Sequence, residues 1–262
     1  MRKYLKTISL VFQDNAVYRF NNFLFIATQI LIFGVFFYLW SSIYHQGGQI
    51  GNYTLNQLIF YYLTVEFLTI IFTHDIAQKI NRVIQEGELS NFLVKPINYF
   101  IYNFAGLIGN IAYLAIMALL IFGIIFIGLN EYLNISFGLS NFFLFMLLAF
   151  LGFIIDFLFF YLIGVSTFWF GQIIGIDYSI ALIINFLEGK IVPLDILPPF
   201  MINLSSWLPF KYLTFIPISV LNGRIEFSLS LVLIPLSWII FLYLLNMIVF
   251  KIGLKKYEGF GA

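Results

Sequence analysis

Two carboxylates lie near the middle of long apolar stretches, Glu66 within residues 58–76 and Asp156 within residues 142–170. A charged side chain at the centre of a bilayer costs about 2.5 to 3.5 kcal/mol, so each acid should be protonated, paired or exposed to water. Such acids can line a substrate path or carry a proton. They can equally hold helices together by hydrogen bonds, and both interpretations stay open.

Neighbouring residues share a helical face with each acid. Tyr62, Thr69 and Thr73 lie at helical spacing from Glu66, and the small residues Ala149 and Gly152 lie at helical spacing from Asp156. These faces should point away from lipid, toward other helices or a cavity. The candidate residues of a substrate path are therefore Tyr62, Glu66, Thr69 and Asp156.

Other chemistry finds little support in the sequence. Gly189-Lys190 lacks the upstream glycine and the following hydroxyl of a phosphate-binding loop, and no other G-x-x-x-x-G-K-[ST] pattern occurs. The two histidines, His45 and His74, lack metal-ligand spacing, and the chain has no cysteine and no G-x-S-x-G motif. We therefore expect no catalytic residue, cofactor site, metal site or ATP site in this chain.

The elements that must position these residues are membrane-spanning helices. Apolar residues make up 62% of the 262 residues and charged residues 10%, which is more apolar surface than a soluble core could bury. Crossing the hydrocarbon layer takes about 20 residues of helix. Five clear spans are predicted, over residues 23–43, 58–76, 100–129, 142–170 and 229–250. The predicted fold class is an all-α integral membrane protein.

A sixth, less regular span is predicted over residues 173–187, which contain Asp177. Six spans would leave most basic residues on the inner side together with both termini, as the positive-inside rule requires. The basic residues left outside would be Lys190, Lys211 and Arg224. The charge distribution therefore favours six spans with both termini in the cytoplasm.

Three further segments complete the predicted single transmembrane domain of residues 1–262. Residues 1–22 read as an amphipathic helix at the membrane interface. Residues 79–98 are charged, with apolar residues at helical spacing, and predict a short helix along the inner surface in which Gly87 would allow a bend. Residues 189–223 hold five prolines, which exclude one straight helix, and aromatic residues that suit the interface, so short re-entrant helices are expected.

Four motifs, in this order, resemble those of the type-2 permeases of ATP-binding-cassette (ABC) exporters. They are IQEGELS at 84–90 with FLVKPI at 92–97, GKIVPL at 189–194 with Leu197-Pro198, LPF at 208–210 with Pro217, and KYEGFGA at 256–262. The resemblance covers essentially the whole chain. The sequence departs from the family pattern at Asp156 and at a short turn between the fourth and fifth spans.

The resemblance implies that two permeases pair, identical or related, above two ABC-type ATPase subunits that hold ATP and magnesium. It implies an elbow helix at 1–22, a coupling helix at 79–95, and an outer gate at 189–217 that includes Gly189, Pro193, Pro198 and Pro209. The coupling residues would be Arg82, Ile84, Glu86, Gly87, Glu88, Leu89 and Leu93. Charged members of this set could contact the ATPase, while Ile84, Leu89 and Leu93 could fill its groove. A solvated surface without a partner is the plainer interpretation of this loop.

Two other functions remain open. In an ion-coupled secondary transporter, Glu66 and Asp156 would carry protons without any ATPase. A membrane subunit that only assembles other subunits is the third possibility. For a transporter, an apolar and aromatic-rich interior would suit an amphiphilic or hydrophobic compound. The expected location is the plasma membrane of a prokaryotic cell.

Overall fold

A computed structural model gives the structure of the chain and describes residues 1–48, 50–72, 75–133 and 138–257. Thr73, His74 and residues 258–262 of the C-terminal motif lie outside these ranges. The described chain is helical and contains no strand, which confirms the predicted class. The helices are α1 (Arg2–Val17), α2 (Arg19–His45), α3 (Leu55–Ile71), α4 (Asp75–Gln85), α5 (Leu89–Leu93), α6 (Tyr99–Leu133), α7 (Leu139–Val165), α8 (Thr167–Phe170), α9 (Ile174–Leu187), α10 (Pro199–Trp207), α11 (Phe215–Leu221) and α12 (Ser230–Lys256), with short 3-10 turns η1 (Leu194–Ile196) and η2 (Phe210–Tyr212).

Five helical stretches within the described residues are long and apolar enough to cross a membrane. They are Arg19–His45, Leu55–Gln85, Tyr99–Leu129, Leu139–Phe170 and Ser230–Lys256. Each contains most or all of one of the five clear spans predicted from the sequence. The bent pair formed by α10 and the stretch Phe210–Leu221, which meet at 85°, raises the number of candidate spans to six.

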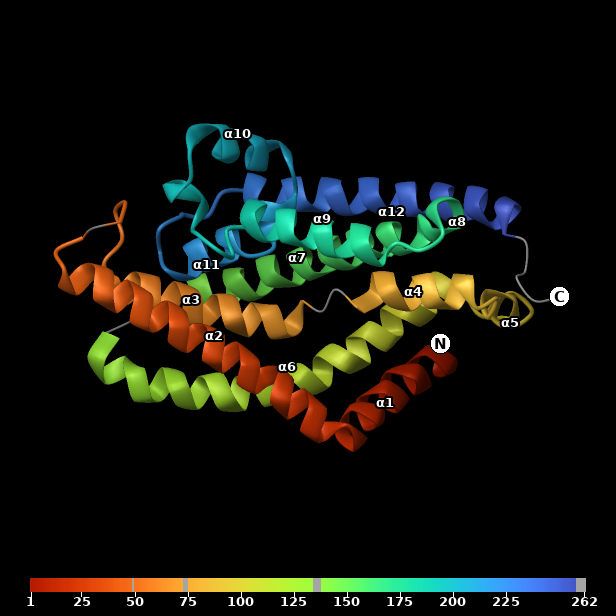
Figure 1. Cartoon of the computed structure of the whole chain (residues 1–262), viewed down its shortest axis with the longest axis horizontal. Helices are drawn as coiled ribbons and strands as arrows, with labels where there is room; N and C mark the ends of the chain where they lie inside the picture. The colour runs from red at the N-terminus through yellow and green to blue at the C-terminus, as the bar shows by residue number, and fades with distance from the viewer. Residues whose placement is uncertain (49, 73–74, 134–137, 258–262) are drawn as a thin grey trace.

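The predicted sixth span, residues 173–187, is the shorter helix α9. Its 14 residues reach only about 21 Å at about 1.5 Å per residue, less than the roughly 30 Å of a hydrocarbon layer. Figure 1 shows α9 leading back from α8 toward the end of the molecule that carries α10 and α11. The start of α1 and the end of α12 lie at the opposite end, near α5 (Figure 1). The chain thus returns across the molecule through α9, which is too short to cross a hydrocarbon layer alone.

The central element is the stretch formed by α3 and α4. In its most apolar window 67% of the residues are buried, against 22% for α2 and 17% for α6 and for α12. Helix α3 begins at Thr54, whose hydroxyl accepts a hydrogen bond from the Gln57 amide while the Gln57 side chain accepts one from the Thr54 amide. This capping box fixes the start of the helix that carries Tyr62, Glu66 and Thr69.

The N-terminal segment divides differently from the predicted helix over residues 1–22. Helix α1 ends at Val17, and residues 19–22 already belong to α2, with a turn at Tyr18 between them (Figure 1). Helix α1 packs on α6 at Gly109, where an added Cβ would lie 2.5 Å from the Ile8 carbonyl oxygen. Only a residue without a side chain allows this approach.

The inner segment 79–98 is also not one helix along the surface. Residues 79–85 are the last part of α4, which continues the line of α3 and packs against α7. The chain then turns at Gly87, whose φ of 75° favours glycine, and α5 follows. Lys79 therefore lies within a candidate span, and α5 is the separate short helix of this segment.

Candidate functional site

A polar cavity of about 420 Å³ lies among α2, α3, α4, α6 and α9. The polar residues that line it after α2 are Thr69, Asp75, Gln78, Asn110, Asp177 and Lys190. Asn21 and Asn22 of α2 add two amides, while aromatic and aliphatic side chains form the remaining walls. The cavity therefore offers both hydrogen-bonding and apolar surface in a chain that is otherwise strongly apolar.

Asp177 connects two walls of the cavity. It is 3% exposed in the first turn of α9, where the helix dipole favours a negative charge. The Gln78 Nε2 atom of α4 donates a hydrogen bond of 3.0 Å to Asp177 Oδ2. The sequence showed Asp177 only as an interruption of the sixth span, because the position of α4 beside it depends on tertiary packing.

Lys190, predicted to lie outside, is half-buried and lines the cavity. It lines the same cavity as Asp75 and Asn21 and interacts electrostatically with Glu66. The chain turns at Gly189, with φ of 83°, directly after the short helix α9, and this turn places Lys190 beside the cavity. The sequence did not show that Lys190 lines a cavity, because this depends on the packing of α9 beside α3 and α4.

The four predicted path residues separate into two groups. Thr69 lines the cavity, and Glu66, 1% exposed, lies close enough to Lys190 to interact with it. Tyr62 is not among the lining residues; its ring stacks on Phe36 with centroids 4.2 Å apart, and its hydroxyl donates to the Ile191 carbonyl at 2.8 Å. Asp156 is buried in α7, which contributes no residue to the cavity. The structure therefore does not bring Asp156 and Thr69 to one cavity.

The outer segment is held against α3 by tyrosine hydroxyls. Tyr61 donates a hydrogen bond of 2.7 Å to the Gly189 carbonyl, next to the bond from Tyr62 to Ile191. A Cβ added at Gly189 would lie 3.0 Å from the Tyr61 hydroxyl oxygen and 3.1 Å from the Phe215 Cβ. Space and backbone conformation both require glycine here.

Three of the prolines in this segment stand immediately before its short helices. Pro193 precedes η1, Pro198 precedes α10, and Pro209 precedes η2. Because proline cannot donate an amide hydrogen bond, it interrupts one helix and suits the start of the next. The predicted series of short helices is confirmed.

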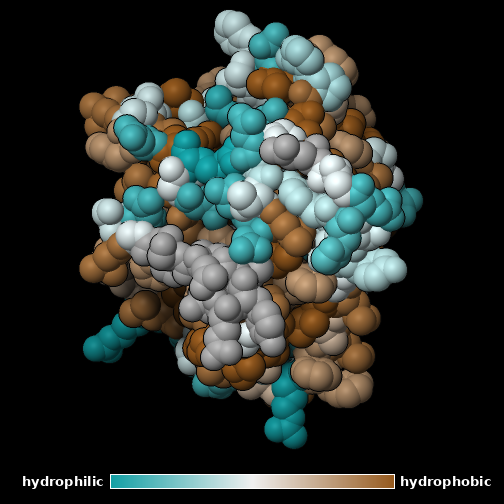
Figure 2. Space-filling model, turned by 90° about the vertical axis from the view of Figure 1, so that its left-hand side faces the viewer, coloured by the Kyte–Doolittle hydropathy of each residue, from teal (hydrophilic) through white to brown (hydrophobic). Residues whose placement is uncertain are grey.

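A charged cluster joins this segment to the loop before α3. Arg224 forms an ion pair of 3.1 Å with Asp195, and its guanidinium lies 3.7 Å from the centre of the Tyr53 ring. The Tyr53 hydroxyl donates to the other Asp195 oxygen at 2.9 Å. Burial, reinforced by Asp195, raises the pKa of Tyr53 above its ordinary value. Figure 2 shows polar side chains gathered on this end of the molecule.

In residues 82–93, the predicted inner loop, the charged side chains are exposed and some of the apolar ones are buried. Arg82, Glu86 and Glu88 are exposed, whereas Ile84 is 4% and Leu89 0% exposed. The chain itself covers Ile84 and Leu89, the two side chains that were predicted to fill a groove of a partner. Leu93, 49% exposed, remains available to a partner.

The inner loop also contacts α1. The Lys3 ammonium donates to the Pro96 carbonyl, and the Tyr4 hydroxyl accepts a hydrogen bond of 3.0 Å from the Asn98 amide. Both acceptor and donor lie in the connection between α5 and α6. A displacement of α5 would therefore act on α1 as well as on α4.

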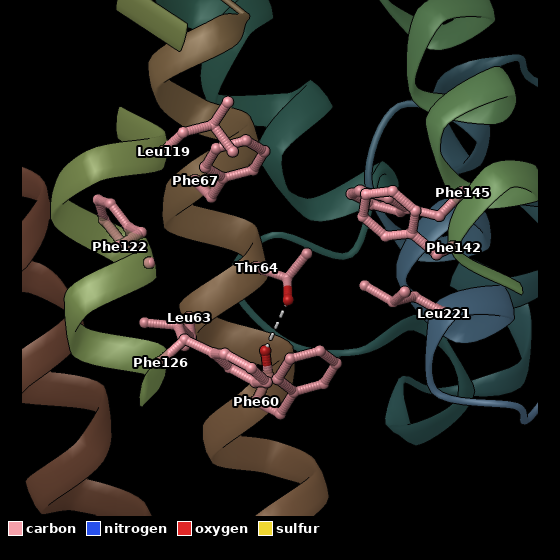
Figure 3. Close-up of a pocket in the computed structure, with 11 residues that line it drawn as sticks. Phe60, Leu63, Thr64, Phe67, Leu119, Phe122, Phe126, Phe142, Phe145 and Leu221 are labelled. Carbon is pink, nitrogen blue, oxygen red and sulfur yellow. Dashed lines mark hydrogen bonds between the residues drawn. The ribbon is translucent and has the colours of Figure 1, made fainter. Parts of the chain in front are cut away.

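A second pocket, of about 160 Å³, lies among α3, α6, α7 and α11 and is shown in Figure 3. Phe60, Phe67, Phe122 and Phe142 form much of its wall. The Thr64 hydroxyl donates to the Phe60 carbonyl at 2.9 Å, so its hydrogen-bond donor is already used within α3 (Figure 3). This pocket offers apolar contacts rather than chemistry.

Among the described residues, no group of three or more His, Cys, Asp or Glu side chains could hold a metal ion. Comparison with curated proteins found no match for the chain. A family model described as "ABC-2 family transporter protein" matches residues 30–261. Because this match extends over most of the helical chain, the protein belongs to the ABC-2 family of transporter proteins and is a multi-pass membrane permease of the ABC type.

Proposed function

We propose that this permease is the membrane-spanning half of an ABC exporter, driven by a separate ATPase subunit that binds ATP and magnesium. Membership of the ABC-2 family, which implies an ABC ATPase partner, supports this proposal. The structural observation that carries it is the path from the inner loop to the cavity. Helix α4 ends at the exposed charges of the loop and bears Asp75 and Gln78 in the cavity wall.

The loop offers a suitable surface for the ATPase. Arg82, Glu86 and Glu88 can make polar contacts, and Leu93 supplies an apolar one. Closure of the ATPase subunits around ATP would push on this surface. The force would reach α4 directly and α1 through Lys3 and Tyr4.

Helix α4 should move together with α7. At Gly164 of α7 an added Cβ would lie 2.8 Å from the Ile80 Cβ, and Thr167 of α8, which directly follows α7, donates a hydrogen bond of 3.0 Å to Asn81. Packed helices of this kind move as rigid units. Displacement of the unit would move Asp75 and Gln78 relative to the walls that α2 and α6 form and thereby open or close the cavity.

The outer segment would serve as the gate. Tyr61 and Tyr62 hold it to α3, and the Arg224–Asp195 pair holds it to the loop before α3. In the inward-facing state these contacts would be intact, and they would separate when cargo leaves. A second permease, identical or related, would complete the path.

The orientation follows from the same proposal. The start of α1, the end of α12 and the inner loop lie at one end of the molecule, which would face the cytoplasm and the ATPase (Figure 1). The cluster of Tyr53, Asp195 and Arg224 would face the outside. We place the protein in the plasma membrane of a prokaryotic cell.

Co-purification tests the proposal. A tagged chain extracted from its native membrane should bring down a phosphate-loop ATPase, and combined Glu86→Lys and Glu88→Lys should abolish this association. Glu226→Lys, an exposed site at the opposite end, is the matched control and should retain the partner. A wild-type chain that purifies without any ATPase would overturn the proposal.

A further inference from the structure

The polar cavity of about 420 Å³ is lined by more acidic than basic side chains. Its described lining includes two carboxylates, Asp75 and Asp177, and one amine, Lys190. That amine already interacts with a third carboxylate, Glu66, which is 1% exposed. Acidic groups therefore outnumber basic groups at this cavity, which favours a cation over an anion.

Asp75 is the carboxylate most open to a ligand. Its spacing from Lys79 would permit an ion pair, but the Lys79 ammonium lies 5.7 Å from the centre of the Tyr102 ring instead. Asp75 is exposed and forms no hydrogen bond or ion pair with another described residue. Its charge is therefore available to a bound molecule.

The remaining walls suit the rest of an amphiphilic ligand. Phe25, Phe72 and Tyr178 line the same cavity and come from three different parts of the chain. Aromatic rings accommodate an apolar body and also attract a cation through their faces. A volume of about 420 Å³ lies within the range of small-molecule sites.

We propose that this cavity binds a cationic amphiphile, a molecule with an amine-like or onium head and an apolar, preferably aromatic, body. The head lies near Asp75 and Asp177, and the body lies against Phe25, Phe72 and Tyr178. That this molecule is the cargo rests on the proposed exporter function. Binding itself rests only on the cavity.

Two probes of nearly the same shape and opposite charge test the sign of the field. Binding of tetraphenylphosphonium and of tetraphenylborate to the purified chain in nanodiscs is measured by equilibrium dialysis. Because both ions also partition into lipid, the readout is the difference between wild type and variants. Asp75→Asn should weaken phosphonium binding roughly two- to fivefold, the order expected for a solvent-accessible ion pair. Combined Asp75→Asn and Asp177→Asn should weaken it about tenfold or more.

Glu226→Gln is the control, because this exposed residue lies outside the cavity and should leave phosphonium binding unchanged. Lys190→Gln should strengthen phosphonium binding by removing the one cationic group of the described lining. Phosphonium binding that is insensitive to Asp75→Asn would overturn the proposal. Specific borate binding that is lost in Lys190→Gln would also overturn it.

Failure of the proposed function gives a different result. If phosphonium binding depends on Asp75 but no ATPase co-purifies, the cation-binding site is supported and the exporter proposal fails. If an ATPase co-purifies but phosphonium does not bind specifically, the exporter proposal is supported and the cation-binding site is overturned.

Discussion

Gln78 of α4 donates its side-chain hydrogen bond to Asp177 of α9, a residue 99 positions later in the chain. This contact joins α4, which leads into the loop at residues 86–88, to the short helix α9. Through it, movement of α4 would pull directly on α9 at the wall of the cavity.

Gln78→Leu should therefore destabilise the protein. The substitution removes a donor from a buried carboxylate, which costs about 1 to 3 kcal/mol. Thermal denaturation in detergent should show a lower midpoint for Gln78→Leu, while Gln85→Leu, on the exposed side of the same helix, should remain close to wild type. Equal effects of the two substitutions would contradict a specific contact with Asp177.

Gly189→Ala tests the early turn after α9. A Cβ at a φ of 83° is strained and would lie 3.0 Å from the Tyr61 hydroxyl, so a loss of about 1 to 3 kcal/mol is expected. Gly175→Ala is the matched control, because no atom lies within 4 Å of its added Cβ and alanine favours helix. The unfolding midpoint should fall only for Gly189→Ala; a similar fall for both would remove the geometric explanation.

Single-cysteine labelling tests the orientation, since the natural chain has no cysteine. In sealed right-side-out vesicles, a membrane-impermeant maleimide should label Glu226→Cys but not Glu88→Cys. Inverted vesicles should give the opposite result. Lys190→Cys should resist the reagent from the outside, because its position lines the interior cavity. Ready labelling of Lys190→Cys from the outside would restore the outer position that the charge rule predicted.

The outer cluster should contribute modestly to stability. The side chains of Arg224 and Asp195 are 21% and 37% exposed, so solvent screens their ion pair. A double-mutant cycle with Arg224→Gln and Asp195→Asn should give a coupling free energy of about 0.2 to 1 kcal/mol in denaturation experiments. A coupling free energy of zero would mean that the ion pair does not stabilise the position of residues 189–223.

Much of this architecture could be predicted from the sequence, because apolar length alone identifies spans. The five long crossings and the series of short outer helices were predictable on that basis, and proline positions marked the starts of η1, α10 and η2. Periodicity also placed Thr69 on an inward face, where it lines the cavity.

What the sequence could not reveal depends on which element covers which. Helical spacing shows that Ile84 and Leu89 are apolar, but only packing shows that the chain buries them instead of leaving them to a partner. Likewise, the sequence did not show that the turn at Gly189 brings Lys190 to the cavity. Asp75 and Gln78 become cavity residues only because α4 continues α3 into the interior.

Site-specific photo-cross-linking from residues 86–93 shows most directly whether this loop contacts an ATPase. A photoreactive amino acid replaces the exposed Leu93 or, as the matched control, the buried Leu89, and adducts formed in native membranes are identified by mass spectrometry. The probe at position 93 should capture a phosphate-loop ATPase, and the probe at position 89 should capture none. If neither position 93 nor probes at positions 86 and 88 gave an ATPase adduct, the proposed coupling surface would be contradicted.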